Sequence, residues 1–273
     1  MQGLSTFIPT KDKARYINAL LKVGYDTIDF GSFVSPKAIP QMRDTADVLK
    51  LLDLSDTKSK LLAIVPNRKG GEIASDYDEI EYLGFPFSIS PTFLKRNINS
   101  TIEKSQQIVG DLLNICDRKN KTLVVYISMA FGNPYGDEWS GDIVANWVDE
   151  LYNMGVRIIQ LSDTVGISSK KSIACLFSAL VPEFKDVEFG LHLHTTLRHW
   201  YKKIDAAFRG GCRRFDTVIN GLGGCPMAEN RLVGNLRTSN LLEYLEINDI
   251  KTDIDEVAFE KAYETALNVF KLS

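Results

Sequence analysis

Short apolar segments alternate with amphipathic ones along the whole chain, and this alternation restricts the possible fold more than any other feature of the sequence. Residues 122–127 are nearly all apolar, as expected for a strand buried on both faces. An alternation of this kind predicts a parallel sheet covered by helices. We place strands at residues 27–30, 61–65, 85–89, 122–127, 157–161, 187–194 and 214–219. We place helices at residues 10–24, 42–51, 72–83, 97–117, 140–154, 170–180, 239–245 and 255–270, with a further helix that ends at Arg209.

The number and order of these segments bear on the architecture. Seven strands are predicted, and a helix precedes the first of them. This order fits an α/β fold of the (β/α)8 TIM-barrel type whose first strand is missing or truncated in this chain; a doubly wound open sheet is the alternative. We favour the barrel. The chain of 273 residues has the length of one barrel and contains no linker or repeat, so residues 1–273 are predicted to form a single catalytic domain.

Polar residues follow most of the predicted strands, at the end where a barrel carries its active site. Strand-end Asn and Ser often cap the next helix, and capping is the interpretation we prefer for Asn67, Ser90 and Ser128. Capping explains less well why two carboxylates and two imidazoles would meet at the same open end of the barrel. The full set is Asp29, Ser32, Asn67, Ser90, Ser128, Asn133, Asp163, His192, His194 and Asn220.

Two of the three histidines, His192 and His194, lie two residues apart in a predicted strand. Side chains two apart on a strand share a face, so both imidazoles point into the same volume. Such a pair suits a divalent cation that takes further ligands from distant parts of the chain. The alternative is a hydrogen-bonded polar pair that fills the barrel interior.

A glycine-rich segment, residues 220–235, follows the last predicted strand and contains Cys225. Glycines permit positive φ angles and close backbone approach, which suits a catalytic loop that carries a reactive group over the mouth. Cys225 is therefore a candidate proton-transfer thiol, with an inert loop thiol as the alternative. Cys116 and Cys175 fall on predicted apolar helix faces, where we expect them in the core.

Composition excludes several classes of function. The formal net charge is −3 and no basic run is present, so we expect no nucleic-acid partner. No apolar run reaches the length of a membrane span, and the four cysteines form no CxxC pair or secreted-type framework. We therefore expect no membrane association and a cytoplasmic location.

Several ordered motifs resemble the 3-hydroxy-3-methylglutaryl-CoA lyase family of metal-dependent TIM-barrel lyases. The similarity runs over nearly the whole chain. The motifs are residues 29–37 (DFGSFVSPK), Pro40-Gln41-Met42, Asn97-Ile98-Asn99 with Ser100 and Ser105, residues 131–135, residues 161–166 (LSDTVG), residues 192–196 (HLHTT), and Gly223-Gly224-Cys225-Pro226 followed by Gly234-Asn235.

The resemblance implies carbon–carbon cleavage of a 3-hydroxyacyl-CoA, to acetyl-CoA and acetoacetate in the parent enzymes. It implies a Mg²⁺ or Mn²⁺ ion held by His192, His194 and Asn235. It places Asp29 and Asp163 beside the substrate, one of them as the base, and makes Cys225 the thiol that handles the proton of the acetyl-CoA fragment. It also implies substrate or CoA contacts at Gln2, Ser32 and Asn97, an acyl-CoA partner, and a homodimer.

The chain also departs from the family pattern. The family begins with a strand that ends in an Arg-Asp pair, and neither residue of that pair is present before the segment that starts at Met1. We therefore expect slow, metal-poor cleavage from the chain as written, and an unstable or oligomer-supported barrel. Thr195 replaces an acid, Asp29 a Glu, and Asn133 a Cys of some members. The alternatives are a non-catalytic CoA- or metal-binding relative and an aldolase- or synthase-type enzyme with another 3-hydroxyacyl substrate.

Overall fold

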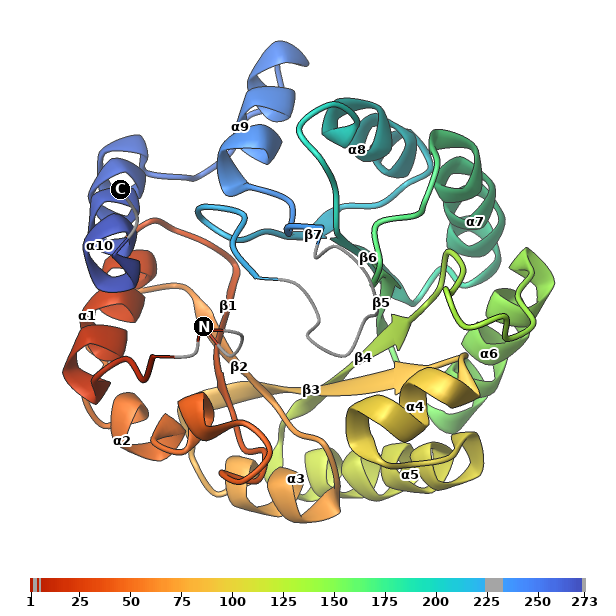
Figure 1. The fold of residues 1–273 in the computed structure, drawn as a ribbon, viewed down its shortest axis with the longest axis horizontal. Helices are drawn as coiled ribbons and strands as arrows, with labels where there is room; N and C mark the ends of the chain where they lie inside the picture. Colours follow the sequence, from red (N-terminus) through yellow and green to blue (C-terminus); the bar gives the residue numbers. More distant parts are fainter. Residues whose placement is uncertain (2–3, 5, 224–232, 272–273) are drawn as a thin grey trace.

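The computed structural model describes residues 1, 4, 6–223 and 233–271. Within them, seven parallel strands form one sheet in the order β1 to β7, which curls into a barrel surrounded by helices (Figure 1). The order never reverses, so the doubly wound sheet is excluded. The strands are β1 (Thr27–Ser32), β2 (Lys60–Ile64), β3 (Ile80–Ser88), β4 (Thr122–Ser128), β5 (Ile158–Asp163), β6 (Glu188–Leu193) and β7 (Arg214–Asp216).

The helices form the outer layer, and each described strand is followed along the chain by at least one of them. They are α1 (Thr10–Leu21), α2 (Thr45–Leu49), α3 (Arg68–Ser75), α4 (Pro91–Ile98), α5 (Ile102–Lys119), α6 (Gly141–Met154), α7 (Lys170–Glu183), α8 (Trp200–Arg209), α9 (Thr238–Ile247) and α10 (Glu256–Phe270), with a short 3-10 turn η1 (Pro40–Met42). No helix in the described residues is long and apolar enough to cross a membrane.

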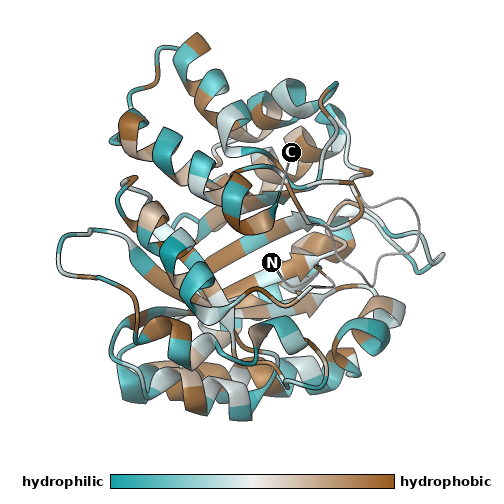
Figure 2. Ribbon diagram, turned by 60° about the vertical axis from the view of Figure 1, so that its left-hand side comes forward, coloured by the Kyte–Doolittle hydropathy of each residue, from teal (hydrophilic) through white to brown (hydrophobic). Residues whose placement is uncertain are grey.

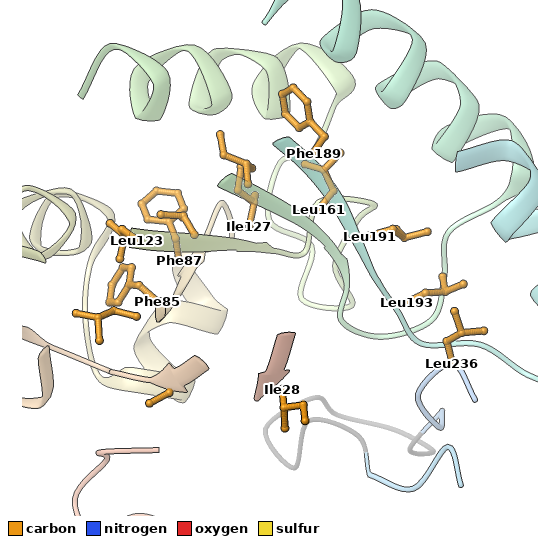
Figure 3. Close-up of a cluster of buried hydrophobic side chains, with 14 of the residues drawn as sticks. Ile28, Phe85, Phe87, Leu123, Ile127, Leu161, Phe189, Leu191, Leu193 and Leu236 are labelled. Atoms are coloured by element: carbon orange, nitrogen blue, oxygen red, sulfur yellow. The ribbon is translucent and has the colours of Figure 1, made fainter. Parts of the chain in front are cut away.

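The two faces of the sheet carry two separate apolar clusters. The larger one joins alternate strand residues to the helices, and Figure 3 shows Phe85, Phe87 and Leu191 among its members. The smaller one consists of Leu62, Tyr82, Val124 and Ile158, which alternate with residues of the first cluster. Because strand side chains alternate between faces, the smaller cluster fills the barrel interior. In Figure 2 the strands are largely hydrophobic, whereas the helices mix hydrophobic and hydrophilic residues.

Two of the three predicted caps are confirmed. The side chain of Asn67 accepts a hydrogen bond from the Gly70 backbone N–H, and that of Ser90 accepts one from Phe93, so each satisfies a free donor at a helix start. Ser128 does not cap a helix; it is the last residue of β4, and its carbonyl accepts a hydrogen bond from the Ser88 hydroxyl.

The largest difference from the predicted elements lies around β3. We expected a helix over residues 72–83 and a weak strand interrupted by Pro86. Instead α3 ends at Ser75, and β3 runs from Ile80 through Pro86 as a long, almost fully buried strand. Pro86 breaks no ladder bond. Gly84 and Pro86 both face β2, but β2 ends at the residue that pairs with Gly84, so no partner on β2 remains for a backbone N–H at position 86.

Two further predictions are wrong in part. The helix expected over residues 97–117 is divided at Asn99, which has a left-handed φ of 50°, and α5 begins only after the Thr101 cap. Cys116 is buried as expected, but Cys175 is exposed on α7.

The seam between β7 and β1 has no strand pairing in the described residues. Side chains span it instead: a guanidinium nitrogen of Arg214 on β7 lies 3.4 Å from the Thr27 hydroxyl on β1 and another lies 3.2 Å from Glu188. The eighth strand of a closed barrel is therefore not among the described residues, in agreement with the predicted first-strand truncation.

Candidate active site

The register of β5, β6 and β7 places polar side chains in one row at the upper end of the barrel interior. Ser162 on β5 pairs with His192 on β6, which in turn pairs with Asp216 on β7. Residues paired in register share a face, and Leu191 and Leu193 belong to the outer cluster. His192 and Asp216 therefore point inward, at the carboxyl ends of their strands.

The predicted histidine pair is confirmed as a local arrangement. The ring centroids of His192 and His194 lie 5.3 Å apart, and the rings of His192 and Tyr126 form a T-shaped pair with centroids 6.0 Å apart. The Nδ1 atom of His192 lies 3.0 Å from an Asp216 carboxylate oxygen. Since a carboxylate accepts hydrogen bonds, Nδ1 carries the proton and Nε2 keeps a free lone pair.

His194 is held in the same tautomer as His192, in this case by a backbone carbonyl. Its Nδ1 lies 2.9 Å from the Val233 carbonyl oxygen, which can only accept, so its Nε2 is also free. The residue is 4 % exposed. Burial, and next the neighbouring imidazole of His192, lower the pKa of His194 to about 4, so the His194 ring stays neutral near pH 7.

Asn235 reaches this site because the end of the glycine-rich segment pairs with β6. His194 and Asn235 form an antiparallel bridge, and the Leu236 N–H donates to the Leu193 carbonyl at 2.9 Å. The amide nitrogen of Asn235 donates to the Leu222 carbonyl at 3.0 Å. That bond fixes the amide and leaves its oxygen available as an acceptor.

The donor set of these three residues fits a divalent cation. In the described part of the chain, no cluster of three or more His, Cys, Asp or Glu side chains could hold a metal ion. A metal site at His192 and His194 therefore needs a different third ligand, and the Asn235 oxygen is of a suitable type. In each of the three side chains one polar atom is hydrogen-bonded and another is left available, which is the arrangement that orients a ligand for coordination.

Asp29 lies inside the barrel, in register with Leu62 of the interior cluster. Its carboxylate is accessible to solvent, and no side chain of the described residues is hydrogen-bonded to it or paired with it. Protein nevertheless surrounds the carboxylate, and the resulting loss of hydration is the largest influence on its pKa. This desolvation, and next the charge of Asp216, raise the pKa of Asp29 to about 7.

Asp163 is in a very different state. It is 1 % exposed and lies 3.1 Å from the ammonium of Lys203, which comes from α8 and is itself buried. It also accepts hydrogen bonds from the backbone N–H and the hydroxyl of Ser168. The Asp163 carboxylate therefore ties β5 to α8 and to the loop that follows β5.

The remaining predicted site residues lie in other settings. Ser32 is buried at the end of β1, where its hydroxyl donates to the Ile64 carbonyl at 3.0 Å. Asn97 is half-buried in the last turn of α4, not on a barrel strand. Asn133 organises its own loop through hydrogen bonds to Tyr135 and Asp137. Gln2 and Cys225 lie outside the described residues.

The sequence prediction missed Asp216 and Lys203. Asp216 interrupts a strand-like run, which is a recognisable signal for an inward polar group, but its pairing with His192 depends on the β6–β7 register. The only sequence feature that could have identified Lys203 is a charged residue on the buried face of the α8 helix.

Comparisons with known proteins point to one family. The family model described as HMGL-like matches residues 1–265. The hydroxymethylglutaryl-CoA lyase YngG of Bacillus subtilis is 33% identical over 254 residues, which cover 93% of this chain and 84% of that protein. The mitochondrial hydroxymethylglutaryl-CoA lyase of Homo sapiens is 32% identical over 257 residues, covering 93% of this chain and 78% of that protein.

Solved structures agree with the sequence relatives. An HMG-CoA lyase from Acinetobacter baumannii, in complex with coenzyme A and 3-methylmalate, superimposes with a TM-score of 0.91 at 29% identity, covering 99% of this chain and 87% of that one. The carboxyl transferase domain of Rhizobium etli pyruvate carboxylase, at 16% identity and a TM-score of 0.74, shares the fold alone. The chain therefore belongs to the HMGL-like family and is a carbon–carbon lyase of the hydroxymethylglutaryl-CoA lyase type.

Proposed function

We propose that this protein cleaves 3-hydroxy-3-methylglutaryl-CoA to acetyl-CoA and acetoacetate, with a divalent cation, Mg²⁺ or Mn²⁺, held by His192, His194 and Asn235. The names of its relatives support the substrate and reaction. The observation that carries the metal assignment is that each of the three side chains is anchored through its other polar atom. When bound, the cation would lower the pKa of the substrate's C3 hydroxyl.

Asp29 is the better base of the two predicted carboxylates. Asp163 is enclosed by Lys203 and Ser168, and a buried, ion-paired carboxylate is poorly placed to receive a proton. Asp29 is accessible inside the barrel, and its pKa of about 7 matches the requirement for a base near neutral pH.

The proposed reaction balances with one base and one acid. Asp29 takes the proton of the C3 hydroxyl, the C2–C3 bond breaks, and C3 becomes the ketone carbon of acetoacetate. The electron pair of the broken bond stays on C2, beside the thioester carbonyl, and the Cys225 thiol then protonates C2 to give acetyl-CoA. Asn97 and Gln2 stay as predicted contacts to the acyl-CoA, whereas the Ser32 hydroxyl is already bonded to Ile64.

The test is a turnover assay of the purified protein with 3-hydroxy-3-methylglutaryl-CoA and Mn²⁺ or Mg²⁺, measuring acetoacetate and acetyl-CoA. His192→Ala and Asn235→Ala should each lower kcat/KM about a hundred-fold or more, because each removes a cation ligand. The control is His199→Ala, since His199 is the remaining histidine and is exposed at the start of α8.

Equal turnover in His192→Ala and the unaltered protein would refute the metal assignment. Acyl-CoA binding without cleavage would identify a non-catalytic relative. Cleavage of a different 3-hydroxyacyl-CoA in place of this one would identify an aldolase- or synthase-type enzyme.

A further inference from the structure

A buried glutamine inside the barrel extends across strand β6 next to the candidate site. Gln160 is on β5 and is 0 % exposed, and its side-chain nitrogen donates to Asp216 on β7 at 3.0 Å. Strand β6 lies between the two. The bond therefore connects two strands that do not pair with each other, and it ends on the carboxylate that faces His192.

Gly190 on β6 makes this reach possible. A Cβ atom at position 190 would lie 1.9 Å from the side-chain oxygen of Gln160 and 2.8 Å from its nitrogen. Gly190 does not have a positive φ, so its backbone conformation does not require glycine. The missing side chain thus serves one purpose: it leaves the space over β6 that the Gln160 amide occupies.

Packing alone does not account for the Gln160 amide. The Gln160 side-chain oxygen is buried and has no hydrogen-bond partner in the described residues. A buried acceptor without a partner lowers stability, and an apolar side chain of similar volume would fill the same space without that cost. The nitrogen is therefore the part of the side chain that accounts for a glutamine at this position.

Both oxygens of the Asp216 carboxylate are occupied as a result. One accepts from the Gln160 nitrogen at 3.0 Å, and the other faces His192 Nδ1 at 3.0 Å. A carboxylate fixed at both oxygens cannot rotate, and so it holds the imidazole in one orientation and one tautomer, with the proton on Nδ1.

We propose that Gln160 and Gly190 together are positioning residues for His192: Gly190 provides the space, and Gln160 locks Asp216 so that the Nε2 atom of His192 points into the barrel mouth as a ligand. The consequence for metal binding rests on the proposed function. The consequence for the His192 ring does not, because it concerns the protein without metal or substrate.

The first test measures the His192 tautomer in metal-free protein labelled with ¹⁵N-histidine. The chain has three histidines, so their signals can be separated and assigned. In the unaltered protein His192 should carry its proton on Nδ1. In Gln160→Met, which keeps the volume and removes the donor, we expect a mixture of both tautomers. Gln41→Met is the control, since Gln41 is also buried but bonds to Ile8, Leu4 and Thr6 instead.

The second test uses Gly190→Ala, which leaves Gln160 chemically intact and displaces its amide. It should produce the same tautomer mixture, and the double variant Gly190→Ala/Gln160→Met should be no worse than the more affected single variant. Calorimetric titration with Mn²⁺ should show a Kd about tenfold higher in each single variant, as for other changes to groups that orient a metal ligand.

An unchanged His192 tautomer in both folded single variants would overturn the proposal. A changed tautomer in protein that binds no Mn²⁺ and cleaves no acyl-CoA would instead support the positioning role and refute the proposed function. A melting curve for each variant separates these outcomes from loss of the fold, and if Gln160→Met does not fold, Gly190→Ala decides.

Discussion

At the scale of single residues, hydrogen-bond partners decide which candidate side chains can do chemistry. The sequence predicts Asp29 and Asp163 as carboxylates at strand ends; Asp163 does end β5, whereas Asp29 lies within β1, and only the structure separates their surroundings. Asp163 is enclosed with Lys203, whereas Asp29 is accessible and has a raised pKa. Strand alternation was sufficient to predict that His192 and His194 share a face, because this depends only on the chain's local geometry.

Asp29 should make the protein less stable as the pH rises. Its pKa is about 7 in the folded chain and near 3.8 when unfolded, so the folded state binds the proton more tightly. Stability should therefore fall as the pH rises from about 4 through 7. Asp29→Asn should raise the free energy of unfolding at pH 8 by about 1 kcal/mol, a value reduced for solvent screening, and change it little at pH 4. Urea unfolding at the two pH values measures this.

The same variant should be almost inactive, and turnover of the unaltered protein should decline below about pH 7 as the base becomes protonated. Asp78→Asn, at an exposed aspartate, is the control for both measurements. An Asp29→Asn protein with full turnover would remove Asp29 from the role of base.

At the scale of elements, apolar runs predicted all seven described strands, but boundaries depended on context that the sequence does not reveal. Residues 80–83 look equally suitable for a helix, and only their pairing with β2 and β4 makes them part of β3. Pro86 suggested an interruption, yet β2 ends just before the position where the missing N–H would matter. The contact between β5 and α8 through Asp163 and Lys203 could not be predicted, since it depends on how α8 is rotated against the barrel.

That contact should be important for stability. Lys203→Met removes the cation and leaves the buried Asp163 carboxylate without its ion-pair partner, so the free energy of unfolding should fall by about 3 kcal/mol. Adding Asp163→Asn should recover much of the loss, because no buried charge is then left. Lys202→Met, at the exposed neighbour on the same helix, should change stability by less than about 0.5 kcal/mol. Thermal and urea unfolding of the four proteins compare these values; equal losses in Lys202→Met and Lys203→Met would contradict the assignment.

At the scale of the whole molecule, the barrel brings together groups that lie far apart in the sequence. The alternation of strands and helices predicted the strand order, and hence that β5, β6 and β7 are neighbours. It could not predict that Asp216 faces His192, or that Asn235 returns to β6, since both depend on register and on loop pairing. The proposed metal role of Asn235 rests on family resemblance and not on residue spacing. The expected homodimer and cytoplasmic location stay predictions.

The most direct test of the central claim is the position of a bound cation. Crystals of the protein soaked with Mn²⁺ should show a single anomalous scattering peak inside the barrel mouth, bonded to Nε2 of His192, Nε2 of His194 and the side-chain oxygen of Asn235. The peak should be lost in His192→Ala and kept in His199→Ala. A peak at any other group of side chains, or no peak in crystals of the unaltered protein, would contradict the account.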